Sequence, residues 1–178
     1  MDDREALKQI LETRSILKGD FTLVSGRKSS YYINGKMTTL HSKGLNLVAR
    51  LMLDLIGDLE FDAIGGPTIG ADPIVGALLS VMAERGMDKE GLLIRKASKE
   101  HGTKKLVEGN LKPGMKVVIL EDVVTTGGSL LRAAEEVKAA GGEIAGIAVV
   151  VDREEGATEA IADAGYSLRS LFRVSELL

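Results

Sequence analysis

The sequence predicts an α/β protein in which a mostly parallel central sheet is flanked by helices. Short apolar runs alternate with amphipathic helical patterns through the middle of the chain, which is the order of strand–helix–strand units. The run at 117–120 consists of β-branched and aliphatic residues, as in strands buried on both faces. Small-residue loops at 66–70 and 125–129 follow two of the predicted strands, where open α/β sheets bind ligands.

The N-terminal residues predict a helix followed by a hairpin. Apolar residues are spaced for one helical face over 4–17, with Leu17 on that face and Gly19 at the helix end. Residues 21–34 predict a short hairpin with its turn at 25–27. So short a hairpin needs a surface to pack on, such as the mouth of a site.

The first strand–loop–helix unit of the sheet follows a second helix, predicted over 43–57. A strand is expected at 61–65, and the loop 66–70 then leads into a helix that runs to about residue 85. Asp72 suits the N-cap of that helix, and Pro73 suits its first turn. The loop is either a second anion site, for a diphosphate, or simply a tight turn, and the sequence favours neither reading.

A charged segment follows the next strand, which is predicted at 92–94 and ends in Arg95 and Lys96. Residues 97–114 have little apolar periodicity, and the segment is longer than most loops in compact domains. It is either a solvated charged loop or a lid that brings cations to an anionic leaving group. The phosphate chemistry predicted for the next strand favours the lid.

The second half of the chain repeats the alternation. Strands are expected at 117–120, 144–151 and 166–171, and helices at 129–140 and 157–164. Parallel strands place their carboxyl ends at one edge of a sheet. The residues expected at that edge are Gly66, Arg95, Asp122 and Arg153.

The stretch after residue 120 has the chemistry of a phosphorylated-sugar site. Glu121 and Asp122 come first, and the loop 125–129 is rich in glycine, hydroxyl groups and backbone N–H groups. A glycine-rich loop at the start of a helix suits a phosphate. The paired acids repel a phosphate but accept hydrogen bonds from hydroxyl groups. A ribose 5-phosphate satisfies both requirements.

Composition excludes several classes of function. The chain has 178 residues, 44% hydrophobic and 28% charged, which predicts one globular domain over residues 1–178. A net charge of −3 argues against a nucleic-acid partner, and no apolar run is long enough to predict a membrane span. The chain has no cysteine, which excludes disulfides and thiol catalysis and favours a cytoplasmic location.

Several stretches carry a resemblance to a known family. Residues 117–129 resemble the phosphoribosyl-diphosphate motif of the type I phosphoribosyltransferases. Residues 21–32 are similar to the N-terminal hood of the orotate phosphoribosyltransferase family, and residues 95–102 are similar to its mobile catalytic loop. Asp152 and Arg153 match the place of its pyrimidine-contacting arginine. The resemblance covers nearly the whole chain in the same order.

This resemblance implies a type I phosphoribosyltransferase fold, with a small hood over about residues 1–40 and a mobile catalytic loop at about 97–110. It implies a pentosyltransferase that moves the ribose 5-phosphate group from 5-phosphoribosyl 1-diphosphate to orotate. The products are orotidine 5′-phosphate and diphosphate, in the biosynthesis of pyrimidines. It also implies Mg²⁺, bound mainly through the substrate, and a homodimer whose catalytic loop is shared across subunits.

The same resemblance implies the roles of individual residues. Lys99, His101 and Asp122 would be catalytic, and Thr125 and Arg153 would bind orotate. The residues that would bind 5-phosphoribosyl 1-diphosphate are Arg95, Lys96, Lys99, His101, Glu121, Asp122, Val123, Val124, Thr125, Thr126, Gly127, Gly128 and Ser129. Cations are needed where the charge of the leaving diphosphate develops, and a closed loop would exclude water that could hydrolyse the donor.

Two positions depart from the family pattern. Val24 and Gly70 stand where many members carry lysine, so two cationic contacts to the donor are missing. Lys28, or Lys104 together with Lys105, is the candidate replacement.

Three other functions stay open on the sequence. One is a phosphoribosyltransferase for another base. The second is a regulator that senses 5-phosphoribosyl 1-diphosphate, against which Lys99, His101 and the acidic net charge all argue. The third is a structural subunit of a larger assembly.

Overall fold

The computed structural model describes residues 2–22, 26, 28–96 and 105–178 of the chain. The strands are β1 (Ile16–Thr22), β2 (Lys28–Ile33), β3 (Ala63–Pro67), β4 (Glu90–Ile94), β5 (Val107–Glu108), β6 (Lys116–Val124), β7 (Glu143–Asp152) and β8 (Leu168–Arg173). The helices are α1 (Asp3–Ile10), α2 (Lys36–Thr39), α3 (Ser42–Leu55), α4 (Asp72–Glu84), α5 (Gly128–Ala139) and α6 (Ala157–Asp163), with a π-helical turn at Leu11–Ser15 and a 3₁₀ turn at Val174–Glu176.

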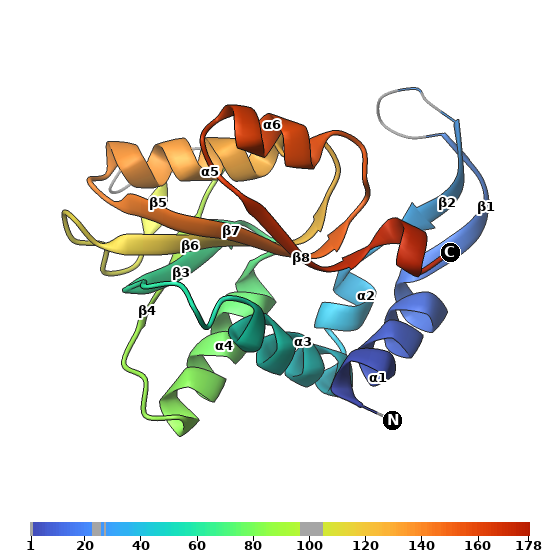
Figure 1. Cartoon of the computed structure of the whole chain (residues 1–178), viewed down its shortest axis with the longest axis horizontal. Coiled ribbons are helices and arrows are strands. Elements are labelled where there is room, and N and C mark those ends of the chain that lie inside the picture. Colours follow the sequence, from blue (N-terminus) through green and yellow to red (C-terminus); the bar gives the residue numbers. More distant parts are fainter. Residues whose placement is uncertain (1, 23–25, 27, 97–104) are drawn as a thin grey trace.

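The described elements form three layers (Figure 1). The middle layer is a six-stranded sheet with the order β5-β4-β3-β6-β7-β8, in which β5 is antiparallel to β4 and the other pairs are parallel. Helices α5 and α6 cover one face, and α1, α3 and α4 cover the other. The predicted mostly parallel sheet flanked by helices is confirmed. Within the described ranges, no helix is both long and apolar enough to cross a bilayer.

The central strand β6 explains why the sequence folds around residues 117–120. Val118 and Leu120 pack in the core beneath α3 and α4, whereas Val117 and Ile119 pack in the core beneath α5. All four side chains are fully buried, because this strand has neighbours on both edges and helices on both faces. A strand in that position has to be apolar on both sides.

The predicted helix at 4–17 is wrong at its C-terminal end. Helix α1 ends at Ile10 and the π-helical turn ends at Ser15, after which the chain enters β1. Leu17 pairs with Tyr32 of β2 and is 53% exposed, so it is not on a buried helical face. Pairing with β2 overrides the local helical spacing here. The predicted hairpin is present, with a longer first strand than expected (Figure 1).

The predicted end of the central strand is also wrong. Strand β6 does not stop at Leu120 but continues to Val124, because its parallel pairing with β7 runs on to Val124 opposite Asp152. Glu121 and Asp122 are therefore strand residues and not loop residues. Their side chains consequently leave the sheet on opposite faces, as successive strand residues do.

Two smaller predictions are corrected. Ala71 and not Asp72 occupies the N-cap of α4, and Asp72 is the first residue of the helix, with Pro73 in the first turn as predicted. Val107–Glu108, inside the segment predicted as a loop, pairs with β4 as the edge strand β5. The short helix α2, between the hairpin and α3, was not predicted.

Candidate active site

An open cavity of about 810 Å³ lies at the carboxyl edge of the sheet. Its described lining comes from β4 and the two residues after it, from β5 and β6, from the loop after β3, and from the first residues of α2 and α4. The lining residues are Lys36, Thr68, Ile69, Gly70, Asp72, Leu93, Arg95, Lys96, Glu108, Glu121 and Asp122. Arg95, Lys96, Glu121 and Asp122, which the sequence placed in one site, are thus brought together.

Asp122 is held between two glycines. A Cβ atom at Gly70 would lie 2.5 Å from its Oδ1, and a Cβ atom at Gly35 would lie 2.7 Å from its Oδ2. Both contacts are closer than real Cβ atoms come, so these two positions need glycine for space. The backbone of the loop after β3 and the start of α2 consequently lie against a carboxylate that is almost buried.

Glu121 lies on the other face of β6 and contacts Ser129 at the start of α5. The Ser129 hydroxyl is 2.9 Å from Oε2 and 3.1 Å from Oε1 of Glu121 and donates to the carboxylate. Burial raises the pKa of Glu121 from 4.5 to about 7, although the Ser129 hydrogen bond opposes the rise. Asp122 raises this pKa further, and Lys96 and Lys36 lower it.

Glu121→Gln should make the protein more stable at pH 8, by up to about 3 kcal/mol. The raised pKa means that ionisation of Glu121 opposes folding. The folded state therefore loses stability as the pH rises from 4.5 to about 7, and the cost is complete above that range. Urea unfolding at pH 5 and pH 8 measures the difference between variant and parent, which should be small at pH 5.

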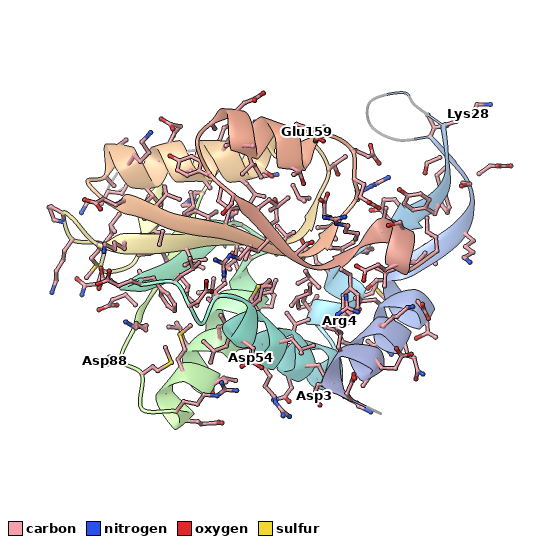
Figure 2. The ribbon with its side chains drawn as sticks, in the orientation of Figure 1. Asp3, Arg4, Lys28, Asp54, Asp88 and Glu159 are labelled. Atoms are coloured by element: carbon pink, nitrogen blue, oxygen red, sulfur yellow. The ribbon has the colours of Figure 1, made fainter. Side chains whose placement is uncertain are left out.

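The matched control is Glu159→Gln on α6, which removes the same charge from an exposed side chain (Figure 2). It should leave the pH dependence of stability as it is in the parent. If the stabilities of Glu121→Gln and the parent changed in parallel with pH, the assignment of a raised pKa to Glu121 would be wrong.

The small-residue loop after β6 ends at an open helix start. Gly127 is the N-cap of α5 with φ +85°, a left-handed conformation that glycine adopts without strain. Having no side chain, Gly127 cannot cap the first N–H groups of α5, and such N–H groups are the usual partners of a phosphate. Arg95, Lys96 and Ser129 together line a smaller hollow at this helix start, so the cations and the loop are close.

Arg153 follows β7 and lies beside the end of β6. Its backbone N–H donates to Val124 O at 3.0 Å, and its side chain is buried, 7% exposed. The guanidinium group lies 5.2 Å from the ring centroid of Tyr31 on β2, and Nη2 lies 2.8 Å from Oε1 of Glu155. Tyr31 of the hairpin therefore lies beside the carboxyl end of β7 and covers the buried guanidinium group of Arg153.

Several residues that the sequence assigns to the site either do not line this cavity or lie outside the residues that the structure describes. Lys99 and His101 lie outside the described residues, as do Val24 and Lys104. Lys28 lies on the hairpin (Figure 2) and lines a hollow of that hairpin, whereas Lys105 lines a hollow beside α5. Neither residue belongs to the described lining of the cavity, so the structure gives no support to either as a replacement cation.

Lys36 and Asp72 line the cavity although the sequence does not assign them to the site, and Thr68 comes from the loop 66–70, for which the sequence leaves a diphosphate site and a tight turn both open. Lys36 gave no signal, because α2 is too short to show periodicity. The sequence predicts Asp72 as an N-cap, yet its Oδ1 is buried without a hydrogen-bond partner in the described structure, and burial raises its pKa. No set of three or more His, Asp or Glu residues in the described ranges is arranged to hold a metal ion by itself.

Comparison with known proteins decides the family. Residues 36–167 match the phosphoribosyl transferase domain model. The orotate phosphoribosyltransferase of Pyrococcus furiosus is 47% identical over 97% of this chain and 93% of its own length. That of Streptomyces avermitilis is 44% identical over 99% of this chain and 98% of its own length. The chain belongs to the orotate phosphoribosyltransferase family.

Solved structures of orotate phosphoribosyltransferases agree with this placement. The Mycobacterium tuberculosis enzyme in complex with Fe(III) dicitrate superposes with a TM-score of 0.87 and 39% identity, covering 99% of both chains. A structure of that enzyme in complex with 5-phospho-α-D-ribosyl 1-diphosphate has a TM-score of 0.84 and 36% identity, again over 99% of both chains. The type I phosphoribosyltransferase fold expected from the sequence is thereby confirmed.

Proposed function

We propose that the protein transfers the ribose 5-phosphate group from 5-phosphoribosyl 1-diphosphate to orotate, releasing diphosphate and forming orotidine 5′-phosphate. The observation that carries the proposal is the cavity at the sheet edge, where Glu121 and Asp122 adjoin Arg95, Lys96 and an uncapped helix start. Relatives 44% to 47% identical over nearly the whole chain bear the name of this activity. The likeness of the entire chain supports the same reaction for this protein.

In our proposal the donor lies across the carboxyl end of β6, where Glu121 and Asp122 point to opposite faces of the strand. Its 5-phosphate binds to the backbone of residues 125–129 at the start of α5, where the helix dipole favours an anion. The ribose hydroxyls donate to Glu121 and Asp122. Its diphosphate then extends toward Arg95 and Lys96, which line the same cavity as the two acids. Lys99 and His101 would complete the diphosphate site from residues outside the described ranges.

Orotate is a planar base with a carboxylate, and Arg153 supplies the matching charge. Glu155 lies beside Nη2 of Arg153, but Nε of the same guanidinium group is buried without a hydrogen-bond partner in the described structure, which is costly. A substrate carboxylate would provide one, in the geometry that guanidinium groups favour. We therefore assign Arg153 and the neighbouring Thr125 to orotate.

The reaction needs charge stabilisation and no covalent nucleophile. As the bond from ribose C1 to the diphosphate breaks, the sugar becomes oxocarbenium-like and the diphosphate gains charge. The carboxylates of Glu121 and Asp122 stabilise the positive charge that develops on the sugar, and the cations stabilise the negative charge that develops on the leaving group. A ring nitrogen of orotate then bonds to C1, and the proton that this nitrogen carried is released to solvent.

The cavity fits Mg²⁺ that enters with the donor. Asp72, Glu121 and Asp122 line it with the carboxylate oxygens that Mg²⁺ prefers, and Oδ1 of Asp72 is buried without a partner in the described structure. The diphosphate of the donor would supply further oxygens. Bound there, the ion would offset the charge of the leaving diphosphate.

We also propose a cytoplasmic homodimer whose catalytic loop completes the neighbouring site. Apolar side chains around the cavity mouth support a partner of the same kind. Leu93 and Ile69 line the cavity and are exposed, and Met37 and Leu40 on or just after α2 are exposed too, Leu40 by 72%. Apolar side chains that gather on an exposed surface are a common mark of an association site.

Mixing two inactive variants should restore activity if the loop acts in the partner's site. Lys99→Ala disables the loop, and Asp122→Asn disables the ribose site. After exchange of subunits in an equal mixture, each hybrid dimer would contain one intact site, which gives about a quarter of the parent activity. Each variant mixed with itself is the control. A mixture as inactive as both controls, with hybrids verified by mass spectrometry, would show that the loop serves its own subunit.

The reaction itself is tested by following the ultraviolet band of orotate with the donor and Mg²⁺ present, and again after EDTA is added. We expect loss of orotate with stoichiometric release of diphosphate, and loss of this activity in EDTA. Uracil and hypoxanthine are the comparison substrates. Preference for either of them would place the protein with enzymes for another base, and tight donor binding without any turnover would indicate a regulator.

A further inference from the structure

Lys36 lines the cavity, but it has no role in the reaction proposed for the site. It is the first residue of α2, and it lines the cavity together with Arg95, Lys96 and Asp122. Its Nζ lies 3.8 Å from Oδ2 of Asp122. The Lys36 side chain is 48% exposed, whereas that of Asp122 is 9% exposed. The ammonium group can therefore move while the carboxylate stays fixed.

Helix α2 is anchored so that Lys36 starts from a fixed place. The hydroxyl groups of Ser15 and Thr38 are hydrogen-bonded at 2.6 Å in a buried contact. Nε of Arg14 donates to Met37 O at 3.2 Å. Gly35 lies against Asp122 so closely that no side chain fits there. These contacts hold the four-residue helix in place. Its first residue, Lys36, therefore extends into the cavity from a fixed backbone position.

The charge balance of the cavity gives Lys36 a reason to be there. The described lining contains the cations Lys36, Arg95 and Lys96 and the acids Asp72, Glu108, Glu121 and Asp122, so it is net negative. Nη1 of Arg95 already lies 3.9 Å from Glu108. A donor with two phosphorylated ends requires positive charge beyond this.

The side of the cavity on which Lys36 lies indicates which end of the donor it meets. Asp122 faces α2 and the loop after β3, and Glu121 faces Ser129 on the opposite side of the strand. The 5-phosphate is assigned to the Ser129 side, and the ribose lies between the two acids. The group that reaches the Lys36 side is therefore the diphosphate on C1.

We propose that Lys36 binds the diphosphate of 5-phosphoribosyl 1-diphosphate directly. In the free protein its ammonium group rests near Asp122. When the donor binds, the ribose hydroxyls take the Asp122 carboxylate and Lys36 contacts the diphosphate oxygens. The inference rests on the function proposed above and adds a cation to the donor site. Lys36 then fills the role for which Lys28 and Lys105 are badly placed.

Lys36→Ala tests this, with Lys36→Arg as the conservative variant and Lys43→Ala as the matched control. Lys43 is an exposed lysine on the first turn of α3 outside the cavity lining. In Lys36→Ala we expect the KM for the donor to rise about 10- to 100-fold, as for loss of one charged hydrogen bond. The KM for orotate should be unchanged. Lys36→Arg keeps the positive charge but changes its geometry, so its KM for the donor should lie between those of Lys36→Ala and the parent.

Calorimetric titration with the donor and Mg²⁺ in the absence of orotate gives a readout independent of turnover. The dissociation constant should rise in parallel with KM in Lys36→Ala and stay at the parent value in Lys43→Ala. Lys36 also lowers the pKa of Glu121, although burial has the larger effect. In Lys36→Ala the pKa of Glu121 should therefore rise, and the pH profile of kcat/KM should shift toward higher pH.

The outcomes separate this inference from the proposed function. If the parent consumes no orotate but binds the donor, the proposed reaction is wrong. The calorimetric comparison of Lys36→Ala with the parent then still shows whether Lys36 binds the donor. If the parent is active and Lys36→Ala binds the donor as well as the parent does, Lys36 is only a partner of Asp122. Melting temperatures of the variants identify any loss of folding, and Lys36→Met then repeats the test with a side chain of similar length.

Discussion

Asp122→Asn should lower kcat/KM for the donor by about 100- to 1,000-fold, the range seen when one group that stabilises transition-state charge is removed. Asparagine has nearly the same shape, so it fits between Gly35 and Gly70 as aspartate does. What is lost is the negative charge opposite the sugar as the bond to diphosphate breaks. The side chain is 9% exposed, so solvent cannot replace that charge.

Steady-state kinetics with both substrates varied measures the effect, and donor binding measured by calorimetry shows how much of it lies in the ground state. Asp88→Asn is the control, because it removes one carboxylate from the exposed loop before β4 (Figure 2). Parent-like kinetics in Asp122→Asn would remove Asp122 from the catalytic residues and leave it a spacer between two glycines.

Gly66→Ala should destabilise the fold by about 4 kcal/mol, at the upper end of what single substitutions do. A Cβ atom at Gly66 would lie 2.0 Å from Leu120 O and 2.5 Å from Cβ of Ala71. Gly66 lies in β3 beside the central strand β6, so the backbone that it would strike is held by the sheet on both sides. Neither group can withdraw as a flexible side chain would.

The control is Gly76→Ala within α4, where a Cβ atom would meet nothing within 4 Å. Alanine favours a helix over glycine, so this variant should gain about 0.5 to 1 kcal/mol. Chemical unfolding of both variants measures the difference. Equal stability of Gly66→Ala and the parent would mean that β3 and β6 can separate at this point, against the packing described above.

Much of the site could be predicted, because its chemistry lies in one continuous stretch. Glu121, Asp122 and the loop 125–129 follow a run that is apolar on both faces, and a parallel strand always carries such a loop to the ligand edge. Arg95 and Lys96 follow their own strand in the same way. Periodicity and strand direction therefore place these groups together before any coordinates are known.

Other features of the site could not be predicted, because they depend on contacts between distant segments. The helix near the N-terminus stops at Ser15 because Ile16 pairs with Ile33, seventeen residues further along the chain. The central strand passes through both acids because β7 pairs with it to the end. Neither boundary is visible in local spacing, which continues smoothly through each of them.

The sequence by itself determined the α/β order, the family and the acids, cations and small-residue loop of the donor site. Only the tertiary structure decided which way the two acids face and which further groups join them. Glu121 turns to Ser129, and Asp122 turns to Gly35, Gly70 and Lys36. The reason is that a strand sends neighbouring side chains to opposite faces, and what lies on each face is set by packing between residues far apart in sequence.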